Sequence, residues 1–167
     1  MMFSKEEYNN RRCWLVIAGT GGMLGHLRDR ARELGVADLV YFTGFIPDEV
    51  RDRLLRMADV AVFPSLYEPF GIVALEAMAA RTPVVVSNVG GFAEIVRNHE
   101  TGIVVNPDSV ESLTWGILHT LNQPDWAAAR VANAYEVVTT EYNWNNIAQR
   151  TLEVYRRVRG ERERADW

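Results

Sequence analysis

The sequence predicts an α/β fold, a three-layer Rossmann-like parallel sheet of about five strands with helices on both faces and extra C-terminal helices. Three observations support this prediction. Five short runs are apolar throughout rather than alternating, which is typical of strands covered on both faces. Segments with helical spacing of apolar residues separate these runs. This alternation indicates right-handed crossover units in a doubly wound sheet.

The strand candidates are short and rich in β-branched residues, and they lie at 14–18, 39–43, 60–63, 83–87 and 102–105. Helical spacing begins at Leu24, Val50 and Ile72, and a shorter apolar segment follows at Ile95. After Pro107 there is no further strand candidate, and helices are predicted at 110–122, 125–140 and 143–159. Asp108 or Ser109 is placed to cap the first of these helices, and Asn143 the last.

Length and charge narrow the choice of protein class. A chain of 167 residues that is 48% hydrophobic can bury one core, so a single domain is expected. We expect a partial helix or disordered segment at 1–12, the domain at 13–159 and a tail at 160–167. The net charge of −4 argues against a nucleic-acid partner, because nucleic-acid-binding proteins concentrate lysine and arginine on one face.

The expected location is cytoplasmic. The single cysteine, Cys13, excludes an internal disulfide, and its apolar neighbours predict a buried, inert thiol. The N-terminal residues carry both charge signs where a signal peptide needs an apolar core. No apolar stretch approaches the ~20 residues of a membrane span, so no stable membrane insertion is expected.

Ligands of open parallel sheets bind beyond the carboxyl ends of the strands, so the loops there are the candidate sites. The first is the glycine-rich segment from Gly19 through Gly21 to Gly25. It can be interpreted as a dinucleotide site, because glycine lets the backbone approach a phosphate, or as a tight turn. Its spacing departs from the dinucleotide fingerprint, and the next strand ends without an acidic residue for a ribose diol.

The second loop, between the strand at 60–63 and the next helix, carries the strongest signal. It presents Glu68 just before a helix that opens near Gly71, where free backbone amides face the loop. Glu76 follows about one turn later among apolar residues, so its carboxylate needs a partner. The structural alternatives are a Glu68 that stabilises the helix dipole and a Glu76 that pairs with Arg81 or Arg97.

A third loop follows the strand at 83–87 and contains the pair Gly90 and Gly91, which again exposes backbone amides. By itself it is also compatible with a simple turn. The histidines, His26, His99 and His119, stand apart from the three loops, so surface or packing roles are predicted for them. No cluster of cysteine and histidine indicates a metal site.

Taken together, the segments EPFGIVALE, VSNVGGFAEIV and ETGIVV resemble the C-terminal domain of retaining glycosyltransferases of the GT-B fold. This is the family of glycogen synthase, sucrose synthase and the group 1 mannosyl- and glucosyltransferases. The resemblance covers residues 14–159. It implies a nucleotide-sugar-binding domain, with a UDP-, ADP- or GDP-hexose as donor, a sugar or lipid as acceptor, and no required cofactor or metal.

The resemblance also implies roles for individual residues. Glu68 matches the first motif glutamate, which faces the donor sugar and supports departure of the nucleoside diphosphate. Glu76 matches the second glutamate, which accepts hydrogen bonds from the ribose diol. The other matching positions are Phe70, Gly71 and Ile72, whose amides hold sugar hydroxyls and phosphate oxygens, Gly44, Phe45 and Ile46 beside the base, Gly19 and Gly21 in the nucleotide cleft, and Gly90 and Gly91 at its far side.

Relative to that family, the chain is expected to lack the N-terminal acceptor domain and the first strand of this domain. The diphosphate-binding Arg and Lys of the family belong to the same missing segment, and Lys5, Arg11 and Arg12 do not match them. Whether the chain alone is an enzyme is therefore open, and binding without turnover is the expectation.

A missing central strand leaves a gap in the sheet, or lets it close up in the order 2-1-3-4-5, or recruits a second chain to form a homodimer. The last case gives the alternative function, a non-catalytic module that assembles through its edge strand. Another GT-B-like enzyme such as a nucleotide-sugar epimerase, and a flavin or NAD protein, are further alternatives.

Overall fold

The computed structural model describes residues 13–164 and divides into two compact units, Met1–Leu54 and Leu55–Trp167. The boundary between the units falls inside helix α2 (Asp48–Met57). The predicted N-terminal segment 1–12 lies outside the described residues, as does the end of the predicted tail.

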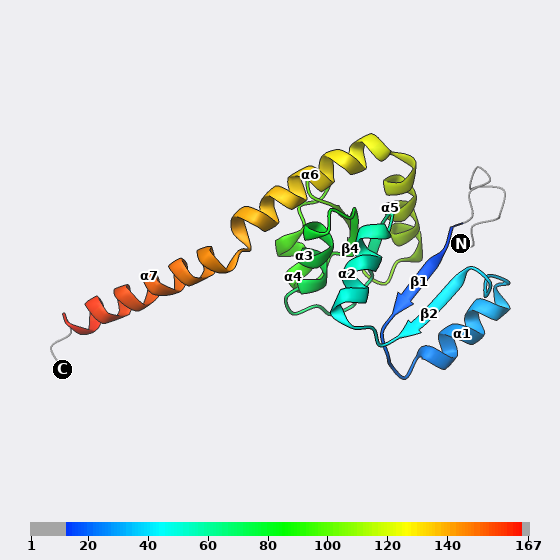
Figure 1. Cartoon of the computed structure of the whole chain (residues 1–167), viewed down its shortest axis with the longest axis horizontal. Helices are drawn as coiled ribbons and strands as arrows, with labels where there is room; N and C mark the ends of the chain where they lie inside the picture. Colours follow the sequence, from blue (N-terminus) through cyan, green and yellow to red (C-terminus); the bar gives the residue numbers. More distant parts are fainter. Residues whose placement is uncertain (1–12, 165–167) are drawn as a thin grey trace. The chain divides into compact units, whose positions relative to one another are not determined.

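The first unit is a small parallel β-α-β arrangement. It contains β1 (Leu15–Ala18), α1 (Leu24–Glu33), β2 (Val40–Gly44) and most of α2. The two strands pair in parallel with Leu15 opposite Val40, and α1 connects them (Figure 1). The register shifts at the end of β1, where Ala18 faces Gly44.

The second unit holds a three-stranded parallel sheet in the order β3-β4-β5, with Val85 between Val62 and Ile103. The helix that follows β3 is α3, and α4 follows β4. Three longer helices complete the unit after β5. Its elements are β3 (Ala61–Phe63), α3 (Ile72–Ala79), β4 (Val84–Ser87), α4 (Gly90–Ile95), β5 (Ile103–Val105), α5 (Val110–Asn122), α6 (Pro124–Glu141) and α7 (Trp144–Arg162).

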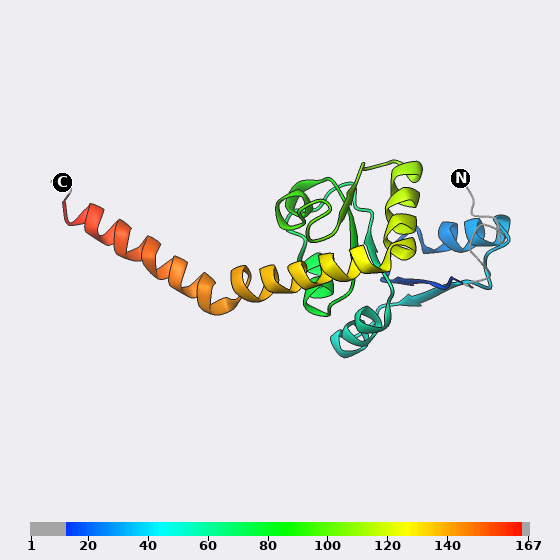
Figure 2. The same ribbon diagram turned by 90° about the horizontal axis from the view of Figure 1, so that it is seen from above.

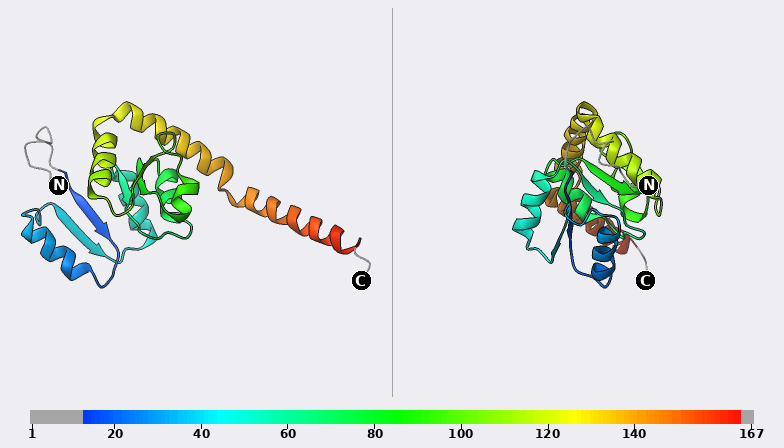
Figure 3. Two further views of the ribbon diagram at one scale, coloured as in Figure 1. Left: turned by 180° about the vertical axis from the view of Figure 1, so that it is seen from behind. Right: turned by 90° about the vertical axis from the view of Figure 1, so that its right-hand side faces the viewer.

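Helices cover both faces of this second sheet. Along β4, Val84 and Val86 belong to a core shared with α3 and α4, whereas Val85 belongs to a core on the α5 side. Successive side chains of a strand point to opposite faces, so one strand contributes to both cores. Figures 1 and 3 show α3 and α4 on one side of β4 and α5 on the other. All four residues of β4 are buried, as the apolar run predicted.

The C-terminal helices lie close to their predicted positions. Ser109 caps α5 by accepting a hydrogen bond from the Ser112 amide, and Asn143 caps α7 by accepting one from Asn146. Asp108, the alternative cap of α5, instead takes a left-handed backbone conformation at φ 52°. Helix α7 continues to Arg162, beyond the predicted end at 159, and has no buried residue (Figure 2).

The α/β class, the parallel pairing and the position of each strand are confirmed. Strands β1 and β2 pair in the first unit, and β3, β4 and β5 pair in the second. Within the first unit, Leu15 on β1 is 52% exposed. Two strands and one helix are too few to bury both faces. Cys13, which precedes β1, is exposed and not buried as predicted.

No helix among residues 13–164 combines the length and the apolar character that crossing a membrane would need.

Candidate functional site

The loop after β3 folds back on itself through Glu68. A side-chain oxygen of Glu68, Oε1, accepts a hydrogen bond of 3.0 Å from the Gly71 amide. Gly71 stands at the N-terminus of α3 with φ 95°, a conformation that side chains disfavour. A Cβ there would also lie 2.7 Å from the Phe92 ring. Glu68 therefore fixes the turn that leads into α3, and glycine at 71 lets the turn pack against α4.

The glycine pair after β4 lies directly against this loop. The Gly91 amide donates a hydrogen bond of 2.9 Å to the Glu68 carbonyl oxygen. A Cβ on Gly90 would come within 2.0 Å of that same oxygen, and one on Gly91 within 1.9 Å of the Phe70 carbonyl oxygen. Both glycines are thus required by close backbone contact. The structure brings together two of the three loops that the sequence singled out.

Helix α3 provides the rest of this part of the site. Its first residue, Ile72, is 59% exposed, and Phe70 just before it is 55% exposed. The N-cap residue of α3, Gly71, has no side chain to cap the helix, and its own amide is held by Glu68. The amide of Ile72 beyond it is placed to meet an acceptor. Glu76 is half-buried and lies one turn further along, about 6 Å along the helix axis from Ile72.

The two arginines that offered a structural role for Glu76 are engaged elsewhere. The guanidinium of Arg97 binds Glu100 and Glu141, at 3.2 and 3.1 Å. The hydrogen bond to Glu100 and the charge of Glu141 raise the pKa of Arg97 above its usual value. Arg81 lies over the Tyr135 ring, 3.9 Å from its centroid. These contacts of Arg97 and Arg81 are with groups other than Glu76.

In the first unit the predicted residues gather at the carboxyl ends of β1 and β2. The Gly19 amide donates a hydrogen bond of 2.8 Å to the Gly44 carbonyl oxygen, and both glycines have positive φ. Phe45 is 81% exposed and Ile46 is half-buried. Gly21 is exposed, with no heavy atom within 4 Å of a Cβ built on it. This unit thus joins the first predicted loop to the segment that follows β2.

The second unit contains a pocket at the carboxyl ends of β4 and β5, which the sequence did not predict. Its volume is about 360 Å³. Asn88 and Asn106, the residues immediately after the two strands, line it together with Arg97 and Asn98. The sequence feature that could have predicted this pocket is the position of the two asparagines directly after predicted strands, where ligands of parallel sheets bind.

Comparison with known proteins gives consistent results. The family model described as "Glycosyl transferases group 1" matches residues 2–137. An uncharacterized glycosyltransferase of Methanocaldococcus jannaschii is 48% identical over 142 residues, which is 85% of this chain and 36% of the relative. The chain thus spans about a third of that relative's length.

Solved structures give the same answer. Sucrose-phosphate synthase from Thermosynechococcus elongatus superimposes with a TM-score of 0.80 at 34% identity, over 93% of this chain and 40% of that one. The Anabaena protein HepE, in complex with UDP-glucose, has a TM-score of 0.78 at 26% identity, over 85% of this chain and 40% of that one. The described strands, helices and glycine turns, together with these matches, show that the chain belongs to the group 1 glycosyltransferase family and has the fold of GT-B enzymes.

Proposed function

We propose that this chain binds the nucleotide-diphospho-sugar donor of a retaining group 1 glycosyltransferase. The observation that carries the proposal is the contact between the loop at Glu68 and the turn at Gly90 and Gly91. This contact brings a carboxylate, two glycine turns and the N-terminus of α3 together. Backbone amides at a helix N-terminus favour phosphate, and the HepE structure with UDP-glucose supports a donor of this class.

In this proposal Glu68 faces the donor sugar, and the amides of Phe70 and Ile72 bind sugar hydroxyls and phosphate oxygens. The Gly71 amide between them is already held by Glu68. Negative charge develops on the departing diphosphate as the sugar leaves, so donors aimed at those oxygens lower the barrier. Glu76 accepts hydrogen bonds from the ribose diol. The loops of the first unit, at Gly19 and Gly21 and at Gly44 to Ile46, contact the nucleotide and its base.

We expect the 167-residue chain to bind the donor weakly and not to transfer the sugar. It corresponds to only 36% of the length of the M. jannaschii relative, and the acceptor site belongs to the remainder of such a protein in this proposal. The donor is a UDP-, ADP- or GDP-hexose.

Titration with UDP-glucose, ADP-glucose and GDP-mannose, followed by calorimetry and by NMR, tests donor binding. One of the three should bind, and Glu76→Gln should weaken its binding about tenfold, because each hydrogen bond to a charged group contributes about 1.5–3 kcal/mol. The matched control is Glu136→Gln, an exposed glutamate on α6. A folded chain that is silent to all three donors at millimolar concentration contradicts the proposal. A Glu76→Gln variant that loses stability but keeps its affinity favours a purely structural Glu76.

The alternative function, assembly through the edge strand, is favoured by one observation. On β1, Leu15 and Val16 are 52% and 43% exposed, and Trp14 beside them is 66% exposed. Exposed apolar strand edges pair with other chains. Sedimentation velocity over a dilution series should then show a dimer that Leu15→Lys dissociates and Tyr41→Lys, an exposed position on β2, leaves intact. A chain that is monomeric at every concentration excludes this function.

A further inference from the structure

The pocket at the carboxyl ends of β4 and β5 lies outside the donor site proposed above. Its volume of about 360 Å³ is at the small end of the range of roughly 300–1,000 Å³ over which ligand pockets occur. Its lining combines small apolar side chains with three carboxamides and one guanidinium. None of the residues assigned to the donor lines it. The pocket is therefore a second candidate binding site in the same unit.

Two of the three carboxamides stand side by side because the strands before them pair. Ser87 is the register partner of Val105, so Asn88 and Asn106 are the next residues along two neighbouring parallel strands. Strands that pair in this way lie about 4.8 Å apart. Side chains alternate between the faces of a sheet, so Asn106 is expected on the face of Val104, which packs with the core beneath α4. Both asparagines line the pocket on this side.

The backbones of these two asparagines are held, but their side chains are not. The Asn88 amide donates a hydrogen bond of 2.8 Å to the Val105 carbonyl oxygen. The Asn106 amide donates one of 2.9 Å to the Ser112 hydroxyl. Within residues 13–164, neither carboxamide has a hydrogen-bond partner. Two rigidly mounted carboxamides are thus free to bind a ligand.

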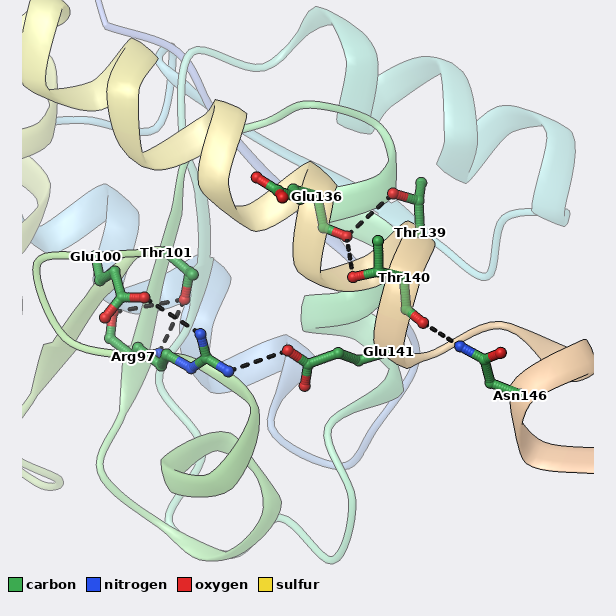
Figure 4. A network of polar contacts seen from close by, with 8 residues as sticks. All are labelled: Arg97, Glu100, Thr101, Glu136, Thr139, Thr140, Glu141 and Asn146. Atoms are coloured by element: carbon green, nitrogen blue, oxygen red, sulfur yellow. Dashed lines mark hydrogen bonds and ion pairs between the residues drawn. The ribbon is translucent and has the colours of Figure 1, made fainter. Parts of the chain in front are cut away.

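The third carboxamide and the guanidinium are partly engaged. Asn98 accepts a hydrogen bond of 2.9 Å from the Val104 amide through Oδ1, which leaves its NH₂ group to donate. The guanidinium of Arg97 binds the carboxylates of Glu100 and Glu141, at 3.2 and 3.1 Å (Figure 4). Two carboxylates beside one guanidinium offset its positive charge, so the pocket has no strong attraction for an anion such as phosphate.

We propose that this pocket binds a neutral polyhydroxy ligand, a monosaccharide unit that is either free or at the end of a glycan. A carboxamide offers an accepting oxygen and two N–H donors, and a hydroxyl both donates and accepts, so neighbouring hydroxyls of a sugar match this lining. The apolar side chains of Ala93, Val96 and Val104 give the C–H face of the sugar ring a surface to pack against. This site does not depend on the donor assignment.

The test is an NMR titration of the ¹⁵N-labelled full chain with methyl α-D-glucopyranoside, methyl α-D-mannopyranoside, maltotriose and mannotriose. At least one sugar should shift the carboxamide resonances of Asn88 and Asn106 at millimolar concentration. A response to a trisaccharide alone identifies the end of a glycan, and an equal response to a monosaccharide identifies a free sugar. UDP, added separately, reports on the proposed donor site through the amides of Gly71 and Ile72, so the two sites are tested independently.

The matched variants replace the unpaired carboxamides. Each of Asn88→Ala and Asn106→Ala should weaken sugar binding about fivefold, because each removes one or more net hydrogen bonds. Neither should change the thermal midpoint of the sugar-free chain, since the carboxamides have no partner within the described residues. Asn145→Ala, at an exposed position on α7, is the control and should keep the parent affinity.

Three results would overturn this assignment. The first is a folded chain whose spectrum no sugar changes. The second is a double variant, Asn88→Ala with Asn106→Ala, that binds sugar as tightly as the parent chain. The third is a set of shifts confined to Glu68 and the residues up to Ile72, which would place the sugar at the donor site instead.

Discussion

Replacing Gly91 by alanine tests the contact between the two loops of the second unit. The added Cβ would lie 1.9 Å from the Phe70 carbonyl oxygen, and the other atoms in its way are also backbone. An ordinary carbon–oxygen contact is about 3.3 Å, so the segments must separate by roughly 1.4 Å. The 2.9 Å hydrogen bond from the Gly91 amide to Glu68 does not survive such a movement. Overpacking costs about 1–3 kcal/mol and the lost hydrogen bond about 1 kcal/mol, so we expect a loss of about 3 kcal/mol.

Urea unfolding followed by circular dichroism measures this loss. With an m-value of about 2 kcal/mol per M, the midpoint should fall by roughly 1.5 M. Gly160→Ala on α7, in the same unit, is the control, because the nearest atom to its Cβ is the end of the Arg164 side chain at 3.5 Å. It should leave the midpoint unchanged or raise it slightly, since alanine favours helix. A Gly91→Ala variant within 0.5 kcal/mol (roughly) of the parent would refute the argument from backbone contact.

Three further predictions concern the second unit. Phe92 is 0% exposed in the core beneath α4, so Phe92→Ala should cost about 3–5 kcal/mol in urea unfolding. Ser109→Ala removes the cap of α5 and should cost about 1 kcal/mol in the same assay. The folded-state pKa of His119 is lowered, so below about pH 6.5 the unfolded chain binds the proton more readily. Stability should therefore fall as the pH drops below that value, and thermal midpoints from pH 8 to 5 should fall less for His119→Gln; an unchanged slope would contradict this.

Periodicity predicted the local elements well, because strands and helices of this fold carry strong short-range signals. The buried run of β4 and the caps at Ser109 and Asn143 are examples in which the determining residues are adjacent in sequence. The strand order β3-β4-β5 was not predictable in this way, because an apolar run such as β4 carries no side-chain pattern that specifies its neighbours.

The candidate site was predictable to a similar extent. The motif glycines located Gly90 and Gly91 beside the Glu68 loop, because only glycine tolerates such a close approach of two backbones. The buried Arg130 was not predicted. Arg130 lies among alanines in α6, and an arginine in such a helix is expected to be exposed. Only the packing of α6 against the rest of the unit shows that it is buried.

The three consecutive valines of β4 do not by themselves set the register of that strand. If the register of β4 shifted by one residue, two of the three paired positions would still hold valine. The side chains of β4 therefore do not by themselves determine which valine faces which core. We infer that contacts with other elements set this register. Val84 packs against Gly102 and Val85 against Gly116, so closely that a Cβ on either glycine would collide with the valine. In this sheet the register of the central strand is therefore set by the glycines that pack against it, and not by its own side chains.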